Sequence, residues 1–156
     1  MAGGADPNTN FTYPYGSIFT AVTGALGQGE RGPANQPPHQ YSFELAKLLL
    51  DVGANPNDSQ ALYNRMFSED DQTITCLWTK CQTYSYWDVD KEYGMLDFLL
   101  GYAVKENFQS RAVLLLEHGA NPTSKDYHNS KTHYENAMVG KNLELASLLR
   151  EYSMKK

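Results

Sequence analysis

The sequence lacks several features that would place it in a broad class of proteins. It contains no run of about 18 apolar residues, the length that a helix needs to cross a bilayer. Its first residues have neither the basic start nor the apolar stretch of a secretory signal. Basic residues are few: 13 Lys and Arg stand against 18 Asp and Glu, and this net charge of −5 gives no basic surface for nucleic acid. We therefore expect a cytoplasmic protein that binds neither membranes nor nucleic acids.

Cysteine is scarce as well. The chain has 2 cysteines, Cys76 and Cys81, and no second Cys pair or His pair lies near them in sequence. A zinc site needs about four ligands, so this pair alone does not indicate one. In a cytoplasmic protein both thiols should be free, and small apolar side chains are their simplest role. We expect no metal and no cofactor.

What the sequence does contain is one phrase in several copies. Its fullest copies pair an apolar helical segment with Gly-Ala-Asn-Pro, one copy lacks the closing part, and one consists of the closing part alone. These copies occupy residues 43–57, 110–123, 143–152 and 4–8. Gly53 and Gly119 lie 66 residues apart, which corresponds to two units of about 33 residues. The chain is therefore predicted to be built from repeats.

Each part of the phrase predicts a local structure. Leu45, Leu48 and Leu49 form an apolar stripe at helical spacing. Gly53 and Gly119 suit the left-handed backbone that follows the end of a helix. The Asn-Pro that comes next prevents the helix from continuing and starts an extended turn. The phrase thus predicts a helix, a stop and a projecting loop.

A first helix should precede each of these second helices, so that every unit is a helix pair. The candidate first helices are Ser17–Thr23, Gln60–Phe67, Met95–Lys105 and Thr132–Val139. In the least regular unit, Asp71–Cys81 is the candidate second helix because its apolar residues recur at helical spacing. Thr73, Ile74 and Thr75 are β-branched, so a strand remains the alternative there.

The repeated phrases resemble those of the ankyrin-repeat family. Leu-Leu-Leu-Asp-Val-Gly-Ala-Asn-Pro at 48–56 and Leu-Leu-Leu-Glu-His-Gly-Ala-Asn-Pro at 114–122 carry the resemblance, and the rest of the chain is similar to a divergent bacterial branch. Thr132 and Ala137 match the family's Thr-Pro-Leu-His-x-Ala motif, whereas the residues between them depart from it. Asn107 stands where the family usually has the more permissive Gly.

The resemblance implies an all-α, ankyrin-like solenoid of about four helix-turn-helix repeats with projecting loops, which binds protein partners. We expect a single domain, 1–156, with approximate units 9–57, 58–93, 94–123 and 124–156. Residues 1–8 look like the end of a preceding repeat, which favours excision from a longer chain. Buried leucines should form the core: Leu45, Leu48, Leu49, Leu62, Leu96, Leu99, Leu100, Leu114, Leu115, Leu145 and Leu148.

An insertion separates the two helices of the first unit. Residues 24–40 are rich in Gly, Pro and Gln and are expected to form a flexible loop. The insertion contains Gly27, Gly29 and Gly32 in the spacing of a dinucleotide-binding loop. That motif requires a preceding strand and a following helix, and prolines follow here instead, so nucleotide binding is not expected.

Histidines and serines offer little for catalysis. Asp126, His128 and His133 lie close in sequence near the last loop, where a metal site or solvated loop residues are the alternatives. No serine or cysteine lies in a recognisable nucleophile motif. We expect no catalytic residue and no enzyme.

The loops hold an unusual share of the aromatic residues, and Tyr and Trp give binding surfaces large, stiff contact areas. The candidate binding residues are Phe11, Tyr13, Tyr15, Tyr84, Tyr86, Trp87, Tyr127 and His128. The alternative is that these rings fold back and cover the irregular second repeat, residues 58–93. We expect a monomer that binds another protein through its concave and loop face. The alternative function is an accessory or inhibitory domain of a larger enzyme or toxin-type system.

Overall fold

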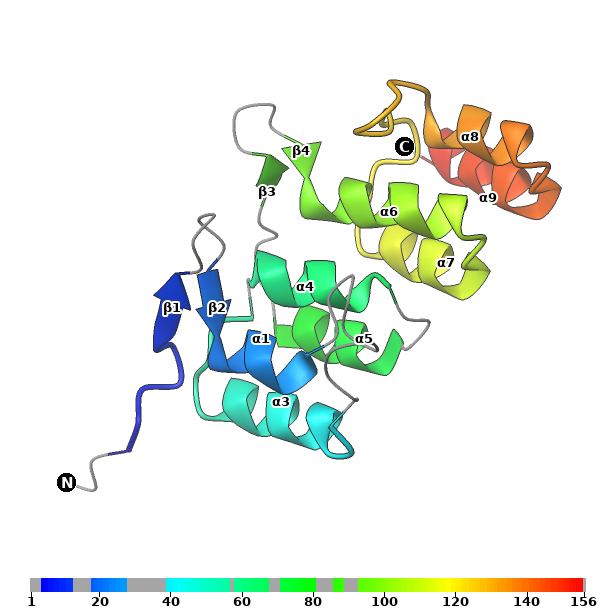
Figure 1. Ribbon diagram of the computed structural model, residues 1–156. Helices are drawn as coiled ribbons and strands as arrows, with labels where there is room; N and C mark the ends of the chain where they lie inside the picture. The colour runs from blue at the N-terminus through cyan, green and yellow to red at the C-terminus, as the bar shows by residue number, and fades with distance from the viewer. Residues whose placement is uncertain are drawn as a thin grey trace. The chain divides into compact units, whose positions relative to one another are not determined.

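The structure, a computed structural model, describes residues 4–12, 18–27, 39–56, 58–67, 71–80, 86–88 and 93–155. The chain divides into two compact units, residues 1–83 and 84–156. Each unit combines helix pairs with one short antiparallel pair of strands (Figure 1). Within the described residues, no helix is long and apolar enough to cross a membrane.

The described residues of the first unit form two helix pairs. Its helices are α1 (Ala21–Leu26), α3 (Ser42–Asp51), α4 (Ser59–Arg65) and α5 (Asp71–Lys80). The first helices α1 and α4 pack on each other, and so do the second helices α3 and α5. The predicted helix from Asp71 is thus confirmed over the strand alternative. Cys76 on α5 is half-buried, whereas Cys81 lies outside the described residues.

The second unit repeats this arrangement. Its helices are α6 (Met95–Lys105), α7 (Gln109–Glu117), α8 (His133–Val139) and α9 (Leu143–Met154). The pairs are α6 with α7 and α8 with α9, and α6 also packs on α8 and α7 on α9. The buried side chains between these helices include Met95, Leu99, Leu100, Leu115, Leu145 and Leu149.

The helices end with the backbone conformations that the repeated phrase predicts. Gly53 has a φ of 101° and Gly119 a φ of 99°, which confirms the left-handed backbone predicted after α3 and α7. Asn107 adopts the same region after α6, with a φ of 59°. At the start of α8, Thr132 and Glu135 form a reciprocal capping box.

The expected all-α solenoid is wrong, because the described residues include two antiparallel strand pairs. β1 (Asn10–Thr12) pairs with β2 (Ile18–Thr20), and β3 (Tyr86–Asp88) pairs with β4 (Tyr93–Gly94). The helix expected from Ser17 begins only at Ala21. Residues 18–20 are β-branched and aromatic, and Phe19 stacks on Phe11 of the opposite strand with ring centroids 5.4 Å apart.

The predicted core is only partly correct. Six of the leucines are buried: Leu62, Leu96, Leu99, Leu100, Leu115 and Leu145. Three are half-buried: Leu49, Leu114 and Leu148. Leu45 and Leu48 are exposed, at 39% and 58% of their surface, so their assignment to the core is wrong. Because α3 packs through Ala46 and Leu50, its opposite face points to solvent.

Candidate functional site

The loop between α7 and α8 is the best-defined feature outside the helices. Its two sides meet at a bridge between Lys125 and Thr132, and the backbone N–H of Asp126 donates to the carbonyl of Lys131 at 2.7 Å. The turn is closed by Ser130, whose φ of 58° lies in the left-handed region. Residues 125–132 therefore form a tight hairpin-like turn (Figure 1).

Asp126 organises the tip of this loop. Its carboxylate oxygen Oδ1 accepts the backbone N–H of His128 at 2.8 Å and that of Asn129 at 3.2 Å. Such bonds from an Asp side chain to the following backbone are typical of stable turns. The backbone that carries Tyr127 and His128 is thus held in place by Asp126.

Two further bonds attach the loop to the start of α6. The carboxylate of Asp97 accepts the backbone N–H of Asn121 at 2.7 Å. The hydroxyl of Tyr93 donates to the carbonyl of Lys125 at 2.8 Å. Burial, with smaller contributions from Asp97 and Asp126, raises the pKa of this phenol, so Tyr93 remains a donor throughout the physiological range.

An aromatic cluster gathers around the loop tip. The ring of Tyr127 lies 5.5 Å from that of Tyr93, 6.1 Å from Phe98 and 5.3 Å from His128, centroid to centroid. Phe98 is buried, Tyr93 and Tyr127 are half-buried, and His128 is exposed. The cluster therefore has a buried base and an accessible rim.

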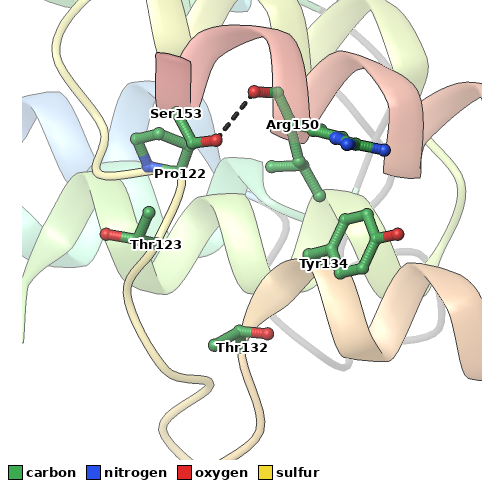
Figure 2. Close-up of a pocket in the computed structure, with 7 residues that line it drawn as sticks. Pro122, Thr123, Thr132, Tyr134, Arg150 and Ser153 are labelled. Atoms are coloured by element: carbon green, nitrogen blue, oxygen red, sulfur yellow. Dashed lines mark hydrogen bonds between the residues drawn. The ribbon is translucent and has the colours of Figure 1, made fainter. Parts of the chain in front are cut away.

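A pocket of about 330 Å³ opens at the base of the same loop (Figure 2). The residues around it are Pro122, Thr123, Thr132, Tyr134, Leu149, Arg150 and Ser153. Three of these hydroxyls are already engaged as donors: Thr123 to Asn121 at 2.9 Å, Thr132 to Glu135 at 2.9 Å and Ser153 to the carbonyl of Arg150 at 2.7 Å. The pocket therefore offers mainly apolar surface, from Pro122, Tyr134 and Leu149.

Arg150 supplies the positive charge beside this pocket. It is exposed on α9, and Figure 2 shows it next to Tyr134, across the pocket from Pro122 and Thr123. Among the described residues, no carboxylate forms a salt bridge with its guanidinium. An apolar pocket with an arginine at its edge suits an apolar side chain that has a carboxylate nearby.

His133 is buried beneath the loop, with none of its surface exposed. Its Nε2 lies 3.0 Å from the hydroxyl oxygen of Ser124, which also donates to the carbonyl of Asn121 at 2.9 Å. Burial lowers the pKa of His133 to about 4, against a smaller opposing effect of Asp126. A serine beside a histidine and an aspartate has the composition of a nucleophile and its base. Here the imidazole is inaccessible and weakly basic, so the arrangement fits an anchor for the loop better than a catalytic group.

Asp126, His128 and His133 are candidate ligands of a metal ion in the sequence, and the structure does not bring them together in that way. In the part of the chain that the structure describes, no group of three or more His, Cys, Asp or Glu residues is placed to hold a metal ion. His133 points into the core, whereas His128 is exposed at the loop tip.

The structure places only some of the predicted binding residues. Tyr127 and His128 lie together at the loop tip, and Phe11 lies in the first unit, on β1, with 61% of its surface exposed. Tyr13, Tyr15 and Tyr84 lie outside the described residues, as do the side chains of Tyr86 and Trp87 in β3.

Sequence reasoning missed Phe98, Tyr134 and Arg150. Phe98 lies beside the leucine stripe of α6, and an aromatic residue next to an apolar stripe could have indicated contact with a loop. Tyr134 and Arg150 show no such signal, because they are separated in sequence and meet only through the pairing of α8 with α9.

No family model matches this sequence, and a search of curated proteins finds no match to it either. The resemblance to ankyrin repeats therefore stays a prediction.

Proposed function

We propose that this protein is a protein-binding module. It holds a partner on the loop between α7 and α8, here called the 120–132 loop after its residues, and in the pocket at the base of this loop. The proposal rests on one observation. A loop tied to α6 and turned tightly at its tip presents aromatic rings beside an apolar pocket that has an arginine at its edge.

The fixed geometry of the loop favours binding. Hydrogen bonds from Asp97, Tyr93 and Asp126 hold the backbone of residues 121–131. This backbone therefore loses little conformational entropy when a partner binds. A surface ordered beforehand loses less entropy on association, so more of the contact energy appears as affinity. Aromatic residues and arginine are also the side chains that most often dominate the energy of protein interfaces.

The pocket indicates the kind of segment that binds. Its volume of about 330 Å³ is at the lower end of ligand sites and suits one large apolar side chain. Arg150 would then pair with a neighbouring carboxylate of the same segment, and the rim formed by Tyr127 and His128 would cover its flank. We propose a partner segment with an acidic residue next to an aromatic or branched aliphatic one.

Binding accounts for this surface better than catalysis does. In the Ser124–His133 pair of the loop the imidazole is fully buried, and the hydroxyls of Thr123, Thr132 and Ser153 donate to groups of the protein itself. We propose that the protein works as a monomer in the cytoplasm, without a cofactor and without an activity of its own.

Affinity capture from the native lysate, followed by mass spectrometry, tests this function. The protein should retain a partner, and the double variant Tyr127→Ala, Arg150→Glu should lose it while circular dichroism shows that the variant remains folded. Lys47→Ala is the matched control, since Lys47 is exposed in the other unit, and it should retain the partner. Retention of the same proteins by the double variant would contradict the proposal.

A further inference from the structure

An unexplained apolar surface lies on α3, in the first unit. Tyr41, Leu45, Leu48 and Val52 are exposed by 57%, 39%, 58% and 61% of their surface. Their spacings of four, three and four residues place them on one side of the helix, at its two ends and along its middle. They form a continuous stripe, which we call the α3 stripe.

The opposite side of α3 is already used for packing. Ala46 and Leu50 are buried at 1% and 6% exposure, and the helix packs against α1 and α5. A helix that is apolar on both sides is typical of one that is covered on both sides. Among the described residues of the first unit, the α3 stripe stays exposed, and it has the composition of an interface.

The second copy of the phrase, in α7, allows the burial of the corresponding leucines to be compared. Leu114 and Leu115 of α7 occupy the places of Leu48 and Leu49, counted back from Gly119 and Gly53. Leu114 is half-buried and Leu115 fully buried, whereas Leu48 is exposed and Leu49 half-buried. The same leucines are therefore better covered in one copy than in the other.

The size of the stripe indicates what covers it. With about 200 Å² for a large side chain, the exposed parts of its four residues amount to roughly 400 Å². A stable interface between two proteins buries about 800 Å² on each partner, so this stripe is too small to hold two copies of the protein together by itself. A single helix is narrow enough to use it in full.

The charges beside the stripe indicate the chemistry of that helix. Glu44 and Asp51 lie along one edge of the α3 stripe, four residues before Leu48 and three after it. Lys47 forms its salt bridge with Asp51 at 2.8 Å, further round the helix from the stripe. With Asp51 paired to Lys47, the excess charge on this edge is the negative charge of Glu44. Together with the net charge of −5, it favours a basic partner and opposes a second copy of the same acidic chain.

We infer that the α3 stripe binds an amphipathic α-helix of another protein, which carries apolar residues at i, i+3 or i+4, and i+7 and Lys or Arg along one edge. This surface lies in the other unit from the 120–132 loop. The inference goes beyond the proposed function, and either can fail without the other.

A designed peptide tests the inference. The probe is a fluorescent helical peptide of about 18 residues with leucines in a single stripe and lysines along one edge, measured by fluorescence anisotropy. It should bind the wild-type protein, and Leu48→Glu should weaken this binding by at least tenfold. Leu143→Glu is the matched control, because Leu143 is 66% exposed on a different helix, and it should leave binding unchanged. Both variants replace exposed side chains, and circular dichroism melts establish that they fold.

Two further arms separate the alternatives. A peptide with glutamates in place of the lysines should bind the wild-type protein at least tenfold more weakly, and the loop variant Tyr127→Ala should bind the lysine peptide normally. Absence of binding to the wild-type protein, or equal binding by Leu48→Glu, would overturn the inference. So would equal affinity for both peptides, or a wild-type dimer in sedimentation equilibrium that Leu48→Glu dissociates.

Discussion

His133 is the residue whose burial has the clearest consequence for stability. Its imidazole is enclosed by Ser124 and Asp126 of the loop and by Gly101 of α6, where an added Cβ would lie only 3.0 Å from the ring. Burial holds its pKa at about 4, below the 6.5 of a free histidine. The folded protein therefore keeps this group neutral at a pH where the unfolded chain binds a proton.

The sign of the pH dependence follows from this difference. Because the unfolded state takes up the extra proton, the stability is complete above pH 6.5 and is lost progressively as the pH falls from 6.5 to 4. Below that range both states are protonated, and the group contributes no further change. Between pH 7 and pH 5, we expect a decrease of about 2 kcal/mol in the free energy of unfolding from this residue.

Urea denaturation at the two pH values measures this decrease. His133→Gln cannot titrate, so its loss of stability between pH 7 and pH 5 should be about 2 kcal/mol smaller than that of the parent. His39→Gln, which replaces an exposed histidine, should keep the full dependence. An equal pH dependence in the parent and in His133→Gln would show that His133 does not act in this way.

At the scale of elements, Asp58 joins the beginnings of two helices. Its Oδ1 accepts the backbone N–H of Ala61 at 2.9 Å and so caps α4. Its Oδ2 accepts the hydroxyls of Thr20 and Thr23, at 2.5 Å and 2.8 Å, at the start of α1. Since Asp58 and Thr23 are both buried, losing the carboxylate leaves polar groups without partners.

We expect Asp58→Ala to reduce the stability of the first unit by about 2–4 kcal/mol, the sum of a lost cap and of bonds to a charged group. Thr23→Val removes one hydroxyl at nearly constant volume and serves as the partner in a double-mutant cycle. The two losses, measured by urea denaturation, should be non-additive by at least about 0.5 kcal/mol. Strict additivity would mean that the bond between these two side chains contributes nothing.

The helices were largely predictable from the sequence, and their faces were not. Met95–Lys105 was predicted with its observed bounds, and Gly53 and Gly119 marked the ends of α3 and α7, because leucine spacing and glycine act locally. Leu48 was assigned to the core wrongly. On a helix with apolar residues on two sides, periodicity cannot tell which side faces the neighbouring helices.

Strand pairing was missed for a related reason. Residues 18–20 form a strand only because Phe19 meets Phe11 across the pair, and such contacts between distant positions leave little trace in a short segment. The cap at Thr20 then delays the start of α1 to Ala21.

At the scale of the whole molecule, the described residues of each unit form two helix pairs, and each unit has a distinct exposed surface. Tyr127 and His128 of the candidate site were predicted, because aromatic residues in a loop are visible in the sequence. The pocket was not, because its walls come from the loop, α8 and α9 and are joined only by packing. We therefore propose the loop surface of one unit and the α3 stripe of the other as two separate docking surfaces.

Hydrogen–deuterium exchange on the protein with its captured partner tests the central claim most directly. Binding at the proposed surface should slow exchange of the backbone amides in residues 121–134, which carry the loop tip and one wall of the pocket. Exchange in the first unit serves as an internal reference, since the α3 stripe does not belong to the proposed loop interface. Slower exchange within 121–134 is the result that this account predicts. Unchanged exchange there, with slowing elsewhere in the chain, would contradict it.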